Sequence, residues 1–269
     1  MQIDPHQVTD IIRRIAVEEV MSRFRQLANH EVSEKAAGEI VTIADTEAER
    51  RLGEEFMTLL PGSKIVGEEG AATNPDSLKA LDDDAPVWIV DPVDGTKNFS
   101  EGKPCFAVMA ALVNKDQIEA AWIHDPIADS TIHAVSGEGA WENGIRLEQP
   151  AARPMEKMTG SFPRNLTRRL RENRNSGISG IPNLVDRYRC VGREYMDMAR
   201  GKLNFLRYGG ELKPWDHTPG ILINRELGGF DALVKTGDPY LFNSKLSSNI
   251  IMLTENVETW KKLTQLSGD

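Results

Sequence analysis

An apolar run that leads straight into a stiff acidic turn is the feature that most limits how this chain can fold. Residues 87–95 read VWIVDPVDG, the composition of a buried strand followed by two aspartates. Pro92 fixes one backbone φ angle and lacks an amide hydrogen, and Gly95 tolerates conformations that other residues avoid. The sequence therefore predicts a rigid turn that holds the carboxyl groups of Asp91 and Asp94 close together.

The residues of this turn suit metal and phosphate chemistry. Two carboxylates this close repel each other unless one is protonated or a cation lies between them. Hard divalent cations bind oxygen atoms, including backbone carbonyls such as that of Val93. After Gly95, free amides at Thr96 and its neighbours would suit a phosphate. A turn with a local cap is the plainer interpretation, because these residue types also cluster for conformational reasons.

Further acidic residues follow apolar runs or lie near the start of predicted helices. Glu68 and Glu69 follow the run KIVG, Asp216 lies in the segment WDHTPG, and Asp45 lies in VTIADTEAE. Taken singly, each is explained by an acidic loop or a helix N-cap. As a set, they place carboxylates on rigid elements, which is how proteins hold the ligands of a functional site.

Composition narrows the class of protein. The chain has 269 residues, 40% of them hydrophobic, enough for one long domain or two ordinary ones. A net charge of −9 argues against nonspecific binding to nucleic acid or to an anionic membrane. Cys105 and Cys190 form no Cys-x-x-Cys pair, which argues against a zinc ribbon or a disulfide framework. With no signal-peptide pattern and no bilayer-length apolar run, we expect a cytoplasmic protein without a membrane partner.

The first part of the chain reads as two helices and then a sheet. Helical spacing of apolar residues covers residues 5–28 and 42–60. A short strand is expected before Glu68, and a polar, exposed segment over 71–86. Short apolar runs between turn residues predict an antiparallel meander over 105–147.

Beyond the meander, predicted strands and helices alternate, which is typical of an α/β architecture. We therefore expect an N-terminal α+β half over residues 1–150, carrying the antiparallel sheet and most metal ligands. A C-terminal α/β half over 151–269 would supply Asp216 and substrate contacts.

Three motifs together resemble one known family. The segments GEE at 67–69, WIVDPVDGTKNF at 88–99 and KPWDHTPG at 213–220 are similar to signatures of the inositol monophosphatase family, which includes a bacterial extragenic-suppressor type. Members are lithium-sensitive, magnesium-dependent phosphatases. The resemblance extends to KAAGEIVTIAD at 35–45 and to the meander. It implies a layered α-β-α-β-α sandwich, the fold shared with fructose-1,6-bisphosphatase.

The resemblance also implies roles for particular residues. Two or three Mg²⁺ ions, with Mn²⁺ as a possible substitute, would be held by Glu68, Asp91, the Val93 carbonyl, Asp94 and Asp216. The implied phosphate and substrate contacts are Gly95, Thr96, Asp94, Gly192 and Arg193. The Thr96 hydroxyl, oriented by Asp45, would help Glu68 activate water for in-line attack, without a phosphoenzyme. Lys35 would lie near the site. For His217, beside Asp216, we expect a place behind the site or at the surface, because isolated histidines have many roles.

The substrate-facing residues depart from the family pattern. Members that bind inositol usually have small residues after the glycine that matches Gly192, where this chain has Arg193 and Glu194. They also have a glutamate at the position of Gly209. Inositol 1-phosphate or a related sugar or polyol phosphate is the family-average substrate. Fructose 1,6-bisphosphate, histidinol phosphate and nucleotide 3′-phosphates stay open, because Arg193 or Arg207 could meet a second anion or form ordinary salt bridges.

An arginine-rich segment leaves a second class of function open. Residues 164–174 contain five arginines, a pattern typical of a solvated helix face or of a surface that binds RNA. Some bacterial relatives also act as binding proteins of the transcription machinery in ribosomal RNA antitermination. The resemblance further implies a homodimer, as is common in the family.

Overall fold

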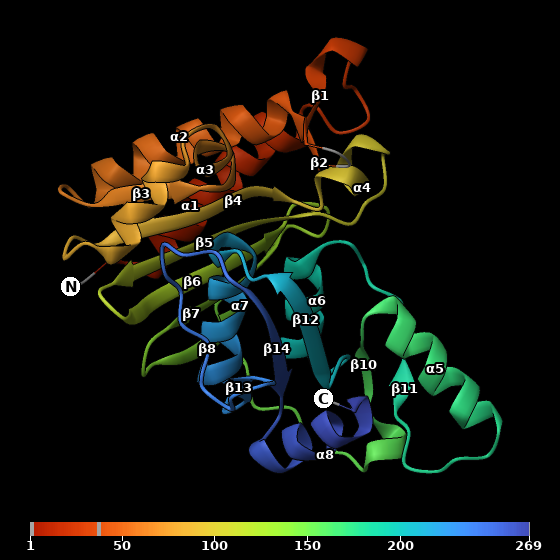
Figure 1. Cartoon of the computed structure of the whole chain (residues 1–269). Coiled ribbons are helices and arrows are strands. Elements are labelled where there is room, and N and C mark those ends of the chain that lie inside the picture. The colour runs from red at the N-terminus through yellow and green to blue at the C-terminus, as the bar shows by residue number, and fades with distance from the viewer. Residues whose placement is uncertain (1–2, 37–38, 269) are drawn as a thin grey trace.

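Two large β-sheets alternate with three layers of helices through the molecule, and β1 and β2 form a separate two-stranded antiparallel sheet (Figure 1). A computed structural model describes residues 3–36 and 39–268 of the chain. The α-helices are α1 Pro5–Ile15, α2 Ile43–Leu59, α3 Glu68–Thr73, α4 Thr96–Ser100, α5 Arg164–Asn175, α6 Val191–Ala199, α7 Pro214–Glu226 and α8 Val257–Ser267. The strands are β1 Val32–Ala36, β2 Glu39–Thr42, β3 Lys64–Gly67, β4 Val87–Asp94, β5 Ala107–Asn114, β6 Gln117–Asp125, β7 Ser130–Val135, β8 Gly139–Glu142, β9 Ile145–Arg146, β10 Thr159–Ser161, β11 Asn183–Leu184, β12 Phe205–Glu211, β13 Phe230–Leu233 and β14 Ser248–Thr254.

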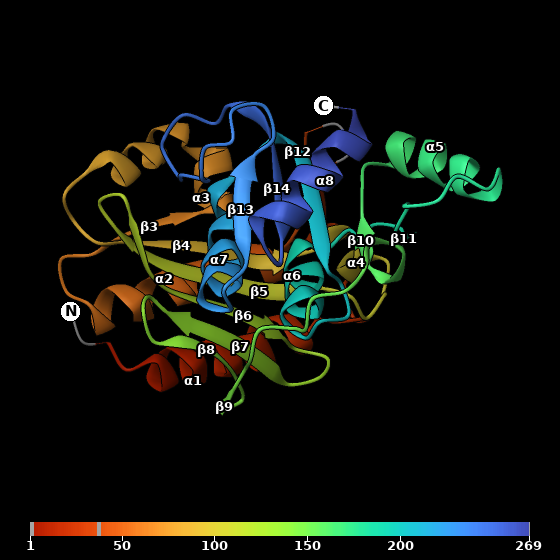
Figure 2. The same cartoon turned by 90° about the horizontal axis from the view of Figure 1, so that it is seen from below.

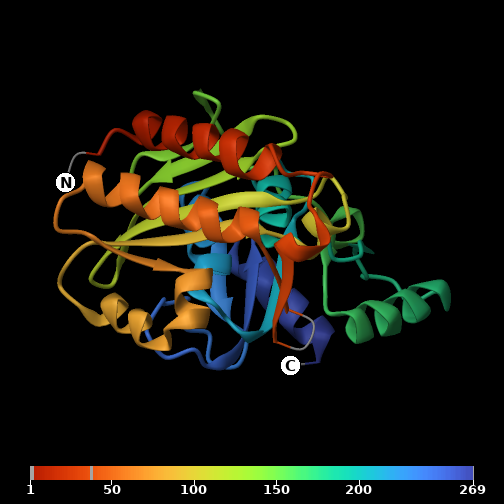
Figure 3. The same cartoon turned by 90° about the horizontal axis from the view of Figure 1, so that it is seen from above.

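The larger sheet contains the predicted meander. Its seven strands follow the order β3-β4-β5-β6-β7-β8-β9, and every neighbouring pair is antiparallel except β3 and β4. Helices α1 and α2 lie side by side across one face of this sheet (Figure 3). Helices α6 and α7 cover the other face, between the two sheets (Figure 1).

The smaller sheet belongs to the second part of the chain. Its order is β11-β10-β12-β14-β13, with β10 parallel to both of its neighbours and the other pairs antiparallel. Helix α8 packs on its outer side, and α5 lies at the edge of the molecule (Figures 1 and 2). The resulting α-β-α-β-α order confirms the predicted fold class.

The side chains of β4 alternate between two hydrophobic clusters, as the two-residue period of a strand requires. Val87 and Ile89 face the cluster that α7 covers, whereas Trp88 and Val90 face α1 and α2. Trp88 stacks on Phe56 of α2 with ring centroids 4.4 Å apart. Because both faces of the strand are buried, its sequence is continuously apolar rather than alternating.

The predicted division of the chain near residue 150 falls between the two sheets. One hydrophobic cluster nevertheless contains residues from both parts, such as Met109 of β5 and Ile221 of α7. The two-half organisation therefore stays a proposal about the chain, and the shared cluster predicts that neither half would keep its core if separated.

Three local expectations were wrong in detail. The helix expected over 5–28 ends at Ile15 and continues as a π-helical segment, Ala16–Met21. The segment 71–86 contains a 3₁₀ helix, Pro75–Asp82, whose Leu78 and Leu81 are buried. The acidic turn is not a turn at all: β4 continues to Asp94, and its pairing with β5 shifts register between Asp91 and Asp94.

No helix among the described residues is both long enough and apolar enough to cross a bilayer.

Candidate active site

Three carboxylates meet at one end of β4. Glu68, Asp91 and Asp216 each offer an oxygen atom that lies within 4.8 Å of the others. We call these three residues the acidic cluster. Strands β3 and β4 are parallel, with Gly67 paired to Val90, so Glu68, which follows β3, lies beside Asp91, which follows Val90 within β4. Asp216 comes from the first turn of α7.

The acidic cluster is strongly self-repulsive. Burial, followed by the charges of Glu68, Asp94 and Asp216, raises the pKa of Asp91 well above its ordinary value. Burial, followed by the charges of Glu68 and Asp94, raises the pKa of Asp216 in the same way. Neither aspartate forms an ion pair with any residue that the structure describes. This all-oxygen donor set fits a hard divalent cation, which would remove the repulsion.

Thr96 is tied to Asp45, as the resemblance implied. The Thr96 hydroxyl lies 3.0 Å from Asp45 Oδ1 and 3.0 Å from the Val93 carbonyl oxygen. A hydroxyl has one hydrogen to donate, so these two acceptors share it. Asp45 Oδ2 also accepts hydrogen bonds from the amide and hydroxyl of Thr42, at 2.8 and 2.6 Å, in a capping box at the start of α2. Burial raises the pKa of Asp45 to about 7, although the hydrogen bonds from Thr42 act in the opposite direction.

Gly95 joins β4 to α4 in a conformation that favours glycine. Its φ angle is 89°, in the left-handed region. A Cβ there would lie 3.0 Å from the carbonyl oxygen of Cys105 and 3.1 Å from that of Arg189. Asn98 Nδ2 donates to the carbonyl oxygens of Cys105 and Tyr188, both at 2.9 Å, and so ties α4 to the segment before α6.

One carboxylate oxygen of Asp94 is held by residues at the start of α6. Asp94 Oδ2 accepts a hydrogen bond from the Gly192 amide at 2.6 Å and another from the Cys190 thiol at 3.1 Å. Burial raises the pKa of Asp94 to about 6, against the effect of these hydrogen bonds. Gly192 is required here because a Cβ would lie 2.8 Å from Met109 Sδ.

The first turn of α3 carries a second group of charges, part of which the sequence analysis missed. Lys35 Nζ lies 3.1 Å from Glu68 Oε1 and 2.6 Å from Glu69 Oε1. Glu49, which was not predicted, accepts the amide hydrogens of Glu69 and Gly70 at 2.8 and 2.7 Å. Glu49 lies four residues after Asp45 on α2, and this helical spacing could have identified it.

Glu194, one of the two residues that depart from the family pattern after Gly192, is held by three hydrogen-bond donors. Glu194, which is buried, accepts hydrogen bonds from Arg187 at 2.9 Å, from the Tyr188 amide at 2.8 Å and from the Tyr208 hydroxyl at 2.8 Å. The Arg187 guanidinium lies 4.3 Å from the centre of the Tyr208 ring. A surface pocket of about 320 Å³ lies here, lined by Pro163, Arg187, Arg189, Cys190, Val191, Glu194, Tyr208 and Gly209.

Arg193 and Arg207 do not line this pocket. Arg193 forms an ion pair with the buried Asp125, and Arg207 is itself buried on β12. His217 is buried too, and its Nδ1 lies 3.1 Å from the Tyr195 hydroxyl. Burial lowers the pKa of His217 to about 3, which keeps this ring neutral behind Asp216.

Comparison with known proteins fixes the class to which this architecture belongs. The model of the inositol monophosphatase family matches residues 4–254. The chain therefore belongs to the inositol monophosphatase family. Among solved structures, the Thermotoga maritima IMPase has a TM-score of 0.78 at 24% identity, covering 98% of this chain and 96% of that one, which supports the fold.

Individual relatives differ in what their names say. An inositol-1-monophosphatase of Rhizobium meliloti is 32% identical over 80% of this chain and 79% of its own. A protein of Thermotoga maritima named fructose-1,6-bisphosphatase/inositol-1-monophosphatase is 30% identical over 73% of each chain. The Nus factor SuhB of Escherichia coli is 30% identical over 82% of this chain and 80% of its own. Sequence identity alone therefore leaves the substrate open.

Proposed function

We propose that this protein hydrolyses a small phosphomonoester in a magnesium-dependent reaction, with inositol 1-phosphate or a related sugar or polyol phosphate as the substrate class. The observation that carries the proposal is the convergence of Glu68, Asp91 and Asp216 within 4.8 Å, beside a Thr96 hydroxyl tied to Asp45. Membership of the inositol monophosphatase family supports it.

The proposed metal ligands are the acidic cluster together with Asp94 and the Val93 carbonyl oxygen. When bound, Mg²⁺ or Mn²⁺ would supply charge to neutralise the phosphate and would activate water as a nucleophile. For Asp94 to take part, the Oδ1 atom is the available one, because Oδ2 is occupied by the Gly192 amide and the Cys190 thiol.

The chain's own residues would orient the reactants and handle the proton. The amides of Gly95 and Thr96 would bind phosphate oxygens at the start of α4. Glu68 would accept the proton of the attacking water, and the Thr96 hydroxyl oxygen would accept a hydrogen bond from that water, with Asp45 Oδ1 fixing the direction of the hydroxyl. Lys35, bonded to Glu68, would hold the glutamate in place.

The leaving group would lie in the pocket near Arg187 and Tyr208. Gly209 contributes no side chain there, so the pocket lacks the carboxylate that inositol-binding relatives present at this position. A site without that group discriminates less strongly among hydroxyl patterns. We therefore propose a broader polyol or sugar phosphate specificity rather than strict selection of inositol. The proposed roles of Gly192 and Arg193 are to hold Asp94 and Asp125, respectively.

The test is phosphate release from inositol 1-phosphate, fructose 1,6-bisphosphate, histidinol phosphate and adenosine 3′,5′-bisphosphate. Each substrate is assayed with Mg²⁺, with chelator, and with the Asp94→Asn protein. Release that needs Mg²⁺ and is severely reduced in the variant supports the proposal. Wild-type turnover by folded Asp94→Asn protein, or no release from any substrate by folded protein with bound metal, would contradict it.

One observation favours a second function, as a binding protein of the transcription machinery. The sequence identity of this chain to a Nus factor SuhB, 30%, is similar to its identity to an inositol-1-monophosphatase, 32%. We propose that any binding role in transcription is independent of the acidic cluster. In α5, Arg171 pairs with Asp186 at 3.0 Å, and Arg169 donates to the Ser267 carbonyl at 2.7 Å. Arg164 and Arg168 have no partner in the described parts of the chain, which leaves them as the cations for such a surface.

One pair of variants separates the two functions. Asp91→Asn should abolish hydrolysis and leave binding to transcription proteins or RNA unchanged. The double variant Arg164→Gln, Arg168→Gln should do the reverse. Loss of both functions in the same folded variant would contradict their independence. Light scattering on the wild-type protein tests the proposed homodimer, which a monomeric mass would exclude.

A further inference from the structure

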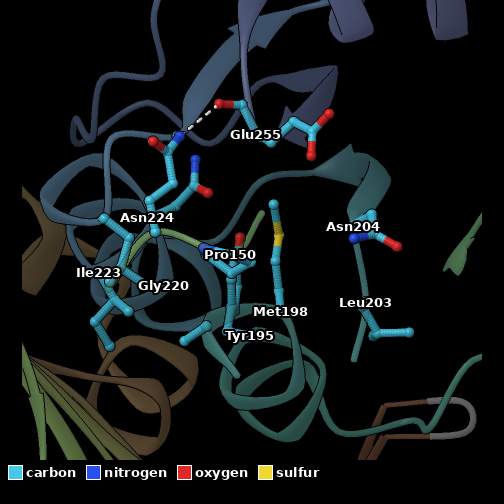
Figure 4. A pocket seen from close by; sticks show the side chains of 13 residues that line it. Pro150, Tyr195, Met198, Leu203, Asn204, Gly220, Ile223, Asn224 and Glu255 are labelled. Carbon is cyan, nitrogen blue, oxygen red and sulfur yellow. Dashed lines mark hydrogen bonds between the residues drawn. The ribbon is translucent and has the colours of Figure 1, made fainter. Parts of the chain in front are cut away.

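A cavity of about 30 Å³ lies among α6, α7 and the turn between β14 and α8. None of the residues that line it belongs to the acidic cluster or to the pocket near Tyr208. In Figure 4, Met198 of α6 extends toward the space between Asn224 of α7 and Glu255, and Leu203 and Asn204 lie on the other side. Most of its wall is apolar, formed by residues such as Ile223 and Leu227.

Two buried polar atoms on this cavity lack a partner. Asn224 Nδ2 and Glu255 Oε2 form no hydrogen bond with any described residue, and these residues are only 7% and 9% exposed. Glu255 Oε1 accepts one hydrogen bond, from the Thr259 hydroxyl at 3.2 Å. The dashed line that ends at Glu255 in Figure 4 involves its backbone carbonyl, which accepts from Gln149 Nε2 at 3.0 Å.

These unpartnered groups have a large cost if nothing occupies the cavity. A buried donor or acceptor without a hydrogen bond destabilises the folded state, and a buried carboxylate normally has a cationic partner. Among the ion pairs of residues 3–36 and 39–268, none includes Glu255. The carboxylate therefore needs a cation or strong donor, and the Asn224 amide needs an acceptor.

A ligand of this cavity should therefore carry both a cationic donor for Glu255 and a hydrogen-bond acceptor for Asn224. A bare metal ion fits poorly, because hard cations need several oxygen ligands and these walls are mainly apolar. It would also meet the donor hydrogens of Asn224. We propose that the cavity binds a small amino alcohol, whose ammonium group pairs with Glu255 and whose hydroxyl oxygen accepts from Asn224. The volume has room for about two to three waters, since one water needs ~10–15 Å³ of such space, and the amino alcohol would displace them.

This cavity is separate from the candidate active site, and the binding that we propose does not depend on the proposed catalytic function. Its connection to the active site is Tyr195, which lines the cavity and whose hydroxyl lies 3.1 Å from His217 Nδ1. Binding can therefore be measured without substrate, metal or turnover.

The test uses three probes of equal size: ethanolamine, n-propylamine, which lacks the hydroxyl, and ethylene glycol, which lacks the ammonium. Each is titrated into protein with ¹³C-labelled methionine methyl groups, at pH 7.5 and constant ionic strength, while the Met198 signal is followed. We expect saturable binding of ethanolamine and at least roughly tenfold weaker binding of the other two, because each leaves one buried polar group unpaired.

Variants make the assignment specific. Glu255→Gln should weaken ethanolamine binding more than tenfold, whereas Glu258→Gln, an exposed carboxylate on α8, should leave it unchanged. Asn224→Leu should remove the preference for ethanolamine over n-propylamine, a readout that requires folded protein. Equal responses to all three probes, no saturable response, or unchanged affinity in Glu255→Gln would overturn the proposal and show that the cavity holds water only.

Discussion

Two parts of the candidate active site differ in how their buried carboxylates are neutralised. We call them the acidic side, which contains Asp91 and Asp216, and the substrate side, which contains Glu194 and Asp125 and which we propose faces the substrate. On the acidic side, Asp91 and Asp216 have no ion pair with any described residue, and burial and mutual repulsion raise the pKa of each. On the substrate side, Glu194 is bonded to Arg187 and Tyr208, and Asp125 is paired with Arg193.

This difference in partners separates carboxylates that need a bound cation from carboxylates that stabilise the fold. A buried carboxylate whose neighbours are other carboxylates is stable only when a cation arrives or a proton is bound. A buried carboxylate that is paired with a guanidinium group and a hydroxyl group needs no bound cation. The acidic side should therefore respond to metal in both activity and stability, and the substrate side should respond to mutation mainly in stability.

The largest expected effect is on turnover, from a change on the acidic side. Asp91→Asn removes a charge from the centre of the acidic cluster without changing its shape. We expect kcat to fall by roughly 10²–10³-fold or more, which is the usual cost of losing a preorganised charged group. Circular dichroism should show an unchanged fold, and thermal stability in chelator should not fall, because the substitution relieves repulsion. A variant with wild-type kcat would contradict the assignment of the acidic side.

The next effect is on stability, from a change on the substrate side. Glu194→Gln removes the charge that Arg187 meets and keeps an acceptor for the Tyr208 hydroxyl. We expect the free energy of unfolding to drop by about 1–3 kcal/mol, with kcat reduced less than roughly tenfold. Urea denaturation measures the first and steady-state kinetics the second. Glu138→Gln, at an exposed position, is the matched control. A loss of turnover in Glu194→Gln as large as that in Asp91→Asn would contradict the difference between the two sides.

Arg193 gives a sharper form of the same comparison. Its guanidinium pairs with Asp125, so Arg193→Met should destabilise the fold by about 1–3 kcal/mol through the buried charge left behind. We expect KM for fructose 1,6-bisphosphate and for inositol 1-phosphate to change in parallel. A selective rise in KM for the bisphosphate would instead place Arg193 in contact with a second phosphate.

The smallest effect is the dependence of stability on pH without metal. Burial raises the pKa of Asp45 and of Glu49 to about 7 in the folded protein. The folded state therefore binds more protons than the unfolded state from about pH 4 to about pH 8, and stability falls as pH rises through the folded-state pKa of about 7. We compare pH 6.5 with pH 8, since buried His124 and His133, whose pKa values are lowered to about 4, affect stability only below about pH 6.5.

In chelator, the melting temperature should be lower at pH 8 than at pH 6.5 by about 2–4 °C. Mg²⁺ should narrow this difference, because a cation replaces the lost protons. Scanning calorimetry at both pH values, with and without Mg²⁺, measures it. The same difference with and without Mg²⁺ would mean that these carboxyl groups titrate independently of the metal site.

The acidic side could be predicted from the sequence because its residues lie in short local motifs. Glu68 and Asp91 follow two apolar runs, and the parallel pairing of β3 and β4 then brings them together. Glu49 was missed although its spacing from Asp45 on one helix was visible. Asp94 was also singled out, and its role as a metal ligand stays a prediction. Its hydrogen bond from the Gly192 amide joins residues 98 positions apart, which no local pattern records.

The contacts of the substrate side could not be predicted, because one pair of partners lies far apart in the chain and the others lie in segments without a regular pattern. Arg193 and Asp125 are 68 residues apart, and the sequence offered no reason to pair them. The pocket residues Arg187 and Arg189 lie in an irregular segment between β11 and α6, where no periodicity constrains the side chains. Here the fold decides which arginine is structural and which faces the pocket.

The most direct test of the contrast is a count of bound Mn²⁺ by electron paramagnetic resonance in the wild-type, Asp91→Asn and Glu194→Gln proteins. The central claim is that the acidic side is completed by divalent cations and that the substrate side is complete without them. It predicts saturable binding to the wild-type and Glu194→Gln proteins, with loss of at least one ion in Asp91→Asn. Equal binding by the wild-type and Asp91→Asn proteins would contradict it.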